Sequence, residues 1–105
     1  MAWVILIVAG LLEVVWTYAM KVSDGFTKLT PSILTLVFMV ASFALLSYAM
    51  KTLPLGTAYT VWTGIGAIGS FLVAILILGE PANAMRMLAA VLIISGLVLM
   101  KLSSS

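Results

Sequence analysis

The fold of this chain is constrained most strongly by four long stretches that are almost free of charged side chains. The one exception is a single acid in the first stretch. The stretches are residues 1–20, 30–50, 52–79 and 87–100. A helix needs about 20 residues, at a rise of about 1.5 Å per residue, to cross a hydrocarbon layer about 30 Å thick. The first three stretches reach this length directly. The fourth reaches it if its helix starts near Ala84 and the long side chains of Arg86 and Lys101 extend toward the headgroups.

The composition agrees with a chain that lies in lipid. Of its 105 residues, 65% are hydrophobic and 8% are charged, whereas soluble domains are about 45–50% apolar and about a quarter charged. A chain this short has no interior large enough to bury so much apolar surface in water. We therefore predict an all-α, four-helix membrane protein, with one integral membrane domain over residues 1–105. Its helices are expected at 2–21, 31–50, 56–78 and 84–102.

Turn and cap residues separate the predicted helices. Thr30 and Pro31 are expected to begin the second helix, with the Thr30 hydroxyl as its cap. Proline and glycine break the chain again at 53–56 and 79–83, where Asn83 is the expected cap of the fourth helix. The N-terminal stretch lacks the basic start and the small-residue cleavage site of a signal peptide, so we expect a mature helix there.

Missing residue types argue against several functions. The chain has no His and no Cys, and its acids are Glu13, Asp24 and Glu80. These residues offer no ligand set for a metal, haem or iron–sulfur cluster and no Ser–His or Cys–His pair, so we expect neither a cofactor nor an enzyme. No phosphate-binding loop for ATP occurs, so uphill transport would depend on an ion gradient. The five basic residues are too scattered to bind nucleic acid.

The basic residues do not select one orientation in the membrane. With four spans, Lys51 and Lys101 lie on the face that carries both termini, and Lys21, Lys28 and Arg86 lie on the other. Orientation follows the Lys and Arg bias of the loops, and two against three is too small a difference to fix it. We hypothesise that the chain inserts both ways round and functions as an antiparallel homodimer. The alternative is a single orientation set by another local effect.

Glu13 is the candidate functional residue with the strongest physical argument. It lies near the midpoint of the first predicted helix, where an ionised side chain costs about 2.5–3.5 kcal/mol on insertion scales. No basic residue lies at the same depth. The carboxyl group must therefore be protonated, be paired with a cation from outside the chain, or line a water-filled cavity. A site where protons and a cation compete for one carboxylate fits these conditions; the alternative is a permanently protonated acid bonded to a neighbouring helix.

Small, aromatic and hydroxyl side chains share the helix face of Glu13, and the third stretch repeats this pattern. The residues are Gly10, Trp16 and Thr17 in the first stretch, and Tyr59, Trp62, Thr63 and Gly66 in the third. Because a buried indole N–H needs an acceptor, Trp16 and Trp62 are expected to converge on the carboxylate. In the second stretch Ser42, which follows Met39 by about one turn, either joins the site or bonds to a carbonyl of its own helix.

Small residues mark two further candidate features. Three glycines near the middle of the third helix either permit close packing or allow the helix to kink between two states. They are Gly64, Gly66 and Gly69. One stripe of the fourth helix is typical of a helix contact and is the expected dimer face. It consists of Ala89, Ile93, Gly96 and Met100.

Four ordered motifs resemble those of the small multidrug resistance transporters, and together they extend along the chain. They are GLLEVVW at 10–16, DGFTKLTPS at 24–32, LPLGTAY at 53–59 and WTGIG at 62–66. The motifs around Glu13 and Trp62 are more similar to the guanidinium exporters of that family than to its drug exporters. The resemblance implies an antiparallel dual-topology homodimer in the bacterial inner membrane. It also implies proton-coupled export, in which the Glu13 carboxylates bind either protons or one guanidinium ion.

The resemblance also assigns roles to other residues. Trp16, Ser42, Tyr59 and Trp62 would line the site and form hydrogen bonds, and residues 64–66 would form the kink of the third helix. A planar guanidinium ion presents paired N–H donors to a carboxylate, which a quaternary ammonium ion cannot do.

Three positions depart from the family pattern that we expect: Thr60, where alanine is usual, Thr17 and Met39. Thr60 adjoins Tyr59, and methionine adapts to varied ligands. We therefore expect the site to accept substituted guanidinium or small quaternary ammonium ions as well, with Met39, Thr60 and Thr63 among its lining residues. The alternatives are a broad exporter of lipophilic cations, a channel, and a membrane subunit that uses Glu13 to pair with a partner protein.

Overall fold

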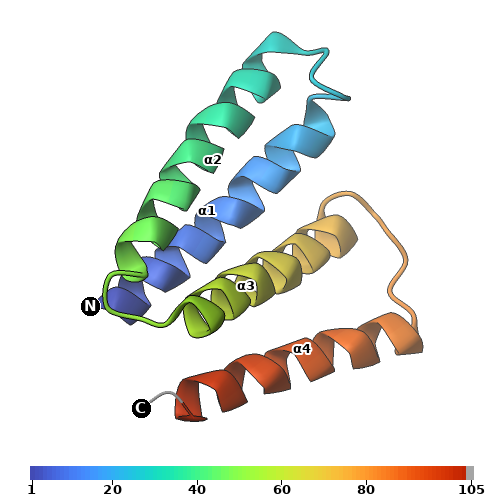
Figure 1. The fold of residues 1–105 in the computed structure, drawn as a ribbon. Coiled ribbons are helices and arrows are strands. Elements are labelled where there is room, and N and C mark those ends of the chain that lie inside the picture. Colours follow the sequence, from blue (N-terminus) through green and yellow to red (C-terminus); the bar gives the residue numbers. More distant parts are fainter. Residues whose placement is uncertain (104–105) are drawn as a thin grey trace.

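The computed structural model describes residues 1–103, which form four helices joined by short loops (Figure 1). The helices are α1 (Ala2–Val22), α2 (Leu29–Ala49), α3 (Leu55–Leu76) and α4 (Ala84–Ser103). Each of them is long and apolar enough to cross a membrane. The expected all-helical architecture with four spans is confirmed, and each helix end lies within two residues of its predicted position.

The start of α2 corrects one prediction. The helix begins at Leu29 with Lys28 as its N-cap residue and no side-chain capping bond, so the Thr30 hydroxyl does not cap it. Pro31 fits within the first turn because the N–H that proline lacks would have no partner inside the helix there. Asn83 is confirmed as the cap of α4, since its Oδ1 accepts the backbone N–H of Arg86 at 2.9 Å.

Ser23 organises the turn between α1 and α2. Its buried hydroxyl donates to the Met20 carbonyl at 2.6 Å and accepts the backbone N–H of Phe26 at 3.1 Å. Its carbonyl accepts the backbone N–H groups of residues 27–28 at 2.9 and 3.2 Å. Residues 24–26 all have positive φ, a conformation that allows the chain to reverse sharply. The turn is therefore closed by its own hydrogen bonds.

The four helices spread into a thin fan in the spatial order α2, α1, α3, α4 (Figure 1). The principal extents are 42, 35 and 16 Å. α1 packs against both α2 and α3, whereas α4 lies at the edge and packs against α3. The N-terminus, the α2–α3 loop and the end of α4 lie at one end of the fan, and the other two loops lie at the opposite end (Figure 1). This arrangement places the chain ends and loops as four antiparallel spans require.

The buried core lies among α1, α2 and α3. It consists of Leu6, Ala9, Leu46, Ala49, Ala58, Val61 and Trp62. The helices approach closely at Gly10 of α1, where an added Cβ would lie 2.7 Å from Cγ2 of Ile65. At the end of the fan that holds the N-terminus, the Lys101 ammonium lies 4.7 Å from the centre of the Trp3 ring, a cation–π contact between α4 and α1.

Candidate functional site

The Glu13 side chain lies against the backbone of α3 at Gly66. A Cβ added to Gly66 would overlap the Glu13 carboxyl group, so a glycine at this position leaves room for the acid between the helices. Oε1 of Glu13 is buried and has no hydrogen-bond partner among the described residues. A buried polar atom without a partner has lost its interactions with water and gained none in exchange. Among the described residues, this oxygen of the carboxyl group is therefore left without a compensating interaction.

The indoles of Trp16 and Trp62 do not bond to this carboxyl group, which corrects the expectation that both would converge on Glu13. Trp62 Nε1 donates to the Ser42 hydroxyl at 3.0 Å. Trp16 Nε1 is buried and has no partner within the described part of the chain. A serine hydroxyl accepts and donates at once, and here it satisfies the Trp62 indole without the acid. Glu13 and Trp16 are thus the two residues of the site with an unpartnered buried polar atom.

Ser42 links three helices. Its fully buried hydroxyl donates to the Ala9 carbonyl of α1 at 2.7 Å and accepts the indole N–H of Trp62 from α3. Of the two alternatives for this serine, a bond to its own helix is therefore not the one observed. The bond to Trp62 fixes the orientation of a large aromatic ring in the core, so Ser42 acts on the site by positioning Trp62.

Aromatic rings from three helices form a row beside these polar groups. The ring centroids of Trp16 and Phe43 are 6.1 Å apart, those of Phe43 and Trp62 are 5.6 Å apart, and those of Trp62 and Tyr59 are 5.7 Å apart. The faces of such rings attract cations. The sequence analysis did not identify Phe43, because a phenylalanine on a largely apolar helix does not stand out; its position next to Ser42 was the available signal.

Thr17, one turn after Glu13 on α1, contacts Ser70 of α3. Oγ1 of Thr17 donates to the Val14 carbonyl at 3.0 Å and lies 2.8 Å from Oγ of Ser70. Either of the two hydroxyls can be the donor in the bond between them. The sequence analysis did not identify Ser70, although it follows Gly66 by four residues and therefore shares its helix face.

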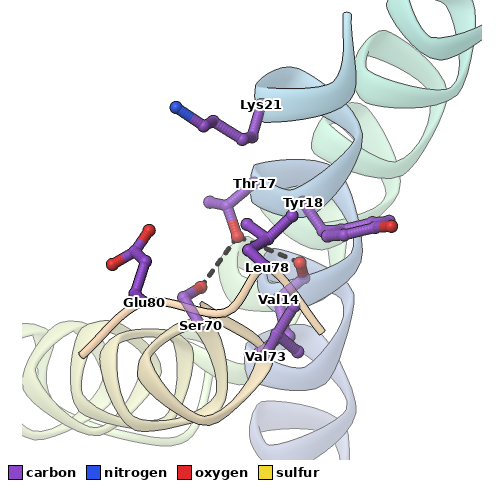
Figure 2. Close-up of a pocket in the computed structure, with 8 residues that line it drawn as sticks. All are labelled: Val14, Thr17, Tyr18, Lys21, Ser70, Val73, Leu78 and Glu80. Carbon is purple, nitrogen blue, oxygen red and sulfur yellow. Dashed lines mark hydrogen bonds between the residues drawn. The ribbon is translucent and has the colours of Figure 1, made fainter. Parts of the chain in front are cut away.

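The hydroxyl pair borders a cavity of about 190 Å³ at the end of α1 and α3 (Figure 2). The lining residues are Val14, Thr17, Tyr18, Lys21, Ser70, Val73, Leu78 and Glu80. Glu80 also pairs with Arg86, with 3.4 Å between Oε1 and Nη2, and both side chains are partly exposed. The cavity thus combines an apolar wall with a charged rim.

Thr60 and Thr63 lie at a different cavity. Both are exposed, and together with Tyr59 they line a space of about 320 Å³ between α3 and α4 whose lining residues do not include Glu13. Met39 is half-buried on α2. Within one chain, the structure therefore brings Glu13, Gly10 and Trp16 together on α1 and joins Ser42 to Trp62, with Tyr59 at the end of the aromatic row.

Gly64 and Gly66 mark close contacts of α3. A Cβ added to Gly64 would overlap the side chain of Leu97 on α4, as one added to Gly66 would overlap Glu13. α3 is one uninterrupted helix over Leu55–Leu76. Close packing therefore accounts for both glycines in this structure, and a kink at 64–66 stays a prediction about a second state.

The predicted dimer face of α4 is largely uncovered. Ala89, Ile93 and Gly96 are exposed, and a Cβ added to Gly96 meets no atom within 4 Å. Met100, at the end of the same stripe, packs against the core of the chain. No residue of α4 is buried within the described part of the chain.

Comparison with known proteins identifies the family. Residues 1–103 match the Small Multidrug Resistance protein family. The chain is 57% identical over 104 residues to a guanidinium exporter of Salmonella typhimurium, with 99% of each chain covered. It is 58% identical to one of Yersinia pseudotuberculosis and 55% identical to one of Citrobacter freundii, with 99% of this chain and 99–100% of each relative covered.

These relatives are transporters by name, and four apolar helices of spanning length make up most of the chain. The protein is accordingly a multi-pass protein of the bacterial inner membrane and not an enzyme. The resemblance seen in the motifs is confirmed: the chain belongs to the small multidrug resistance family.

Proposed function

We propose that this protein is a proton-coupled antiporter that exports guanidinium ions, with protons and the cation competing for Glu13. The observation that carries the proposal is the Glu13 carboxyl group, which lies against Gly66 with a buried oxygen that has no partner in the described chain. Relatives that match almost end to end are named guanidinium exporters, which supports the choice of cation.

The chemistry around Glu13 suits a planar cation. A guanidinium ion directs paired N–H donors at carboxylate oxygens, and it also stacks on aromatic rings. The row of Trp16, Phe43 and Trp62 supplies such rings, and Ser42 holds Trp62 in place. A quaternary ammonium ion would make the ring contacts alone, because it has no N–H donor for the carboxylate.

Coupling follows from exclusive occupancy of the carboxylate. A protonated carboxyl group is neutral and attracts a cation weakly, whereas a carboxylate that holds a cation is no longer available to a proton. In a homodimer, two Glu13 side chains would face one cavity and titrate as a coupled pair. A proton gradient directed into the cell then drives the cation outward, because protons displace it on the side where they are abundant.

The central experiment is a current measurement in proteoliposomes with guanidinium under a pH gradient. We would compare wild type, Glu13→Gln and Asp24→Asn, because Asp24 is an exposed acid in the α1–α2 turn and undergoes the same carboxylate-to-amide change. We expect currents from wild type and Asp24→Asn, and none from Glu13→Gln protein that still dimerises.

Each competing function gives a different result in that experiment. A wild-type current from Glu13→Gln would refute the role of the carboxylate. A channel would conduct without a fixed ratio of protons to cations. A membrane subunit that only pairs with a partner protein would give no current as the purified wild type.

We also propose that the functional unit is an antiparallel homodimer, joined through α4. The support is the exposed stripe of Ala89, Ile93 and Gly96 on α4, of which Ala89 and Ile93 also line open cavities between α3 and α4, together with the nearly even split of the basic residues between the two faces. A thin fan about 16 Å deep encloses little space by itself, and in the proposed dimer a second copy would enclose a cavity at Glu13.

Labelling tests the dual orientation directly, since the chain contains no Cys. Single cysteines at Lys28 and Lys51, which lie in loops at opposite ends of the fan, would be treated with a membrane-impermeant maleimide in intact cells and in inverted vesicles. We expect each position to be labelled from both sides. Labelling of each position from one side alone contradicts the proposal.

The substrate range is proposed to include substituted guanidinium and small quaternary ammonium ions. The support is that Thr60 adjoins Tyr59, the last ring of the aromatic row, although within one chain the cavity that both line does not include Glu13. Currents from wild type and Thr60→Ala would be compared over a panel of guanidinium, alkylated guanidinium, tetramethylammonium and a bulky lipophilic cation. We expect Thr60→Ala to alter the ranking of the substituted ions. Currents with guanidinium alone would restrict the range, and currents with the bulky cation as large as with guanidinium would favour a broad drug exporter.

A further inference from the structure

Two contacts follow one another along the interface of α1 and α3. The first is between Glu13 and Gly66, and the second is the hydrogen bond between Thr17 and Ser70. Each residue of the second contact follows its counterpart in the first by four positions, so both lie one turn, about 5.4 Å, further along the same helix faces. The hydroxyl pair therefore lies between Glu13 and the end of the fan that carries Lys21.

Beyond the hydroxyl pair, the 190 Å³ cavity leads toward that end of the molecule. Figure 2 shows Thr17 and Ser70 joined across the space between α1 and α3, with Lys21 one turn further along α1 and Glu80 on the chain after α3. The volume is sufficient for several water molecules, at about 30 Å³ each in the liquid. The rim carries an ammonium group and a carboxylate, so the outer part of the cavity is polar enough to be hydrated.

The two helices are also closely packed next to the pair. A Cβ added to Gly69 would overlap the side chain of Val14, so α1 and α3 are in direct contact beside the hydroxyls as well as at Gly66. With only 2.8 Å between the oxygens of Thr17 and Ser70, an ion cannot pass between them. The hydroxyl pair and the neighbouring contact between Val14 and Gly69 therefore lie between the cavity and Glu13.

A pair of neutral hydroxyls suits a closure that has to open repeatedly. When Ser70 withdraws, Thr17 keeps its bond to the Val14 carbonyl, and each hydroxyl oxygen has lone pairs that accept N–H donors. A guanidinium ion passing between them would thus replace the bond that it breaks. Two apolar side chains would offer the cation nothing, and an ion pair would resist separation more strongly.

We infer that the Thr17–Ser70 pair is a gate between Glu13 and the cavity that Lys21 and Glu80 border, and that it opens to accept the N–H donors of the cation as the cation passes. The inference rests on the proposed export of guanidinium. In this inference the two hydroxyls control the passage of the ion, whereas Glu13 binds it.

A disulfide can lock this gate. In the double variant Thr17→Cys/Ser70→Cys, diamide would take up two electrons and two protons from the thiols as the disulfide forms, and intact mass would verify that the link is within one chain. We expect the guanidinium current in proteoliposomes to fall to background on oxidation and to return with dithiothreitol. The two single-cysteine variants should be insensitive to diamide. A current that persists in fully cross-linked protein would overturn the inference.

Conservative substitutions separate passage from binding. Thr17→Val and Ser70→Ala each remove one hydroxyl of the pair, and Thr17→Val also keeps the shape of the side chain. Ser70→Thr keeps the hydroxyl. As a control, Ser47→Ala removes an exposed hydroxyl of α2. We expect Thr17→Val and Ser70→Ala to lower the maximal transport rate by about tenfold, the effect of losing one hydrogen bond to a passing cation. Their guanidinium Kd should be unchanged, and Ser70→Thr should retain most of the rate.

Two outcomes would contradict the gate specifically. Either variant could transport at the wild-type rate, or its rate and Kd could change in parallel, as for a residue of the binding site. Absence of current in the wild type would instead refute the proposed function itself, so the two failures are distinguishable.

Discussion

Replacing Gly66 with alanine would displace the carboxyl group on which the proposed transport depends. The added Cβ would overlap the Glu13 carboxyl group, whereas non-bonded carbon atoms are comfortable at about 3.5–4.0 Å. The acid must therefore withdraw by about 1 Å or more. Because the carboxyl group is the far end of a flexible side chain, the helices can stay packed while its position changes.

The expected loss follows from one hydrogen bond. A hydrogen bond to a charged group contributes about 1.5–3 kcal/mol, and every 1.4 kcal/mol or so is a factor of ten in affinity. A displaced carboxylate that loses one of the paired bonds to guanidinium should bind the ion roughly 10- to 150-fold more weakly. The free energy of unfolding should change by less than the free energy of guanidinium binding, because the side chain can move aside.

Calorimetric titration of guanidinium onto the purified protein would measure the loss, with two matched glycines as controls. Gly69→Ala adds a Cβ that overlaps Val14 and so disturbs the same helix interface without touching the acid, and Gly56→Ala adds one that meets no atom within 4 Å. We expect Gly56→Ala to bind as wild type and Gly69→Ala to change far less than Gly66→Ala. Wild-type affinity in Gly66→Ala, or an equal loss in Gly69→Ala, would refute the reasoning.

Three other outcomes are expected. Ser42→Ala leaves the buried Trp62 N–H without an acceptor and should lower the free energy of unfolding by about 1–3 kcal/mol, measured by denaturation in detergent. The further change Trp62→Phe removes the unpartnered N–H and should recover part of the loss. No recovery would contradict a contribution of this hydrogen bond to stability. Guanidinium affinity should fall as pH falls, because protons occupy Glu13, and titrations over a pH series that gave one constant affinity would contradict competition. Asn83→Ala removes the cap on the Arg86 N–H and should cost about 1 kcal/mol of stability with no change in transport rate; a thermal unfolding curve like that of wild type would be the opposite result.

The membrane explains why the fold could be predicted from single stretches of sequence. Every backbone group of a spanning segment must be bonded within its own helix, so length, charge and breaker residues are enough to find the helices. The capping residues are less predictable, because several neighbouring residues can serve as the start of the same helix. Asn83 was predicted correctly from its position before the fourth helix. Thr30 was predicted wrongly as a cap, because the helix begins before it, at Leu29.

The site was predictable where one helix carries it and not where helices meet. The spacing of Gly10, Glu13 and Trp16 on α1 follows from the helical repeat alone. The bond of Trp62 to Ser42 and that of Ser70 to Thr17 depend on how far one helix is shifted and rotated against another. The helical repeat within one helix carries no information on the shift and rotation between helices. The partner of each polar side chain therefore became known only from the structure.

The turn closed by Ser23 bears on how the chain can be inserted. Its hydroxyl and carbonyl take up backbone groups of the same turn, so this reversal does not depend on a particular solvent or headgroup for its shape. In the proposed dual topology, each loop would be exposed to two compartments of different acidity and ionic content. A hairpin that carries its own hydrogen bonds can present the same geometry in either compartment. One sequence can then supply both members of an oppositely oriented pair without a second gene or a second loop design.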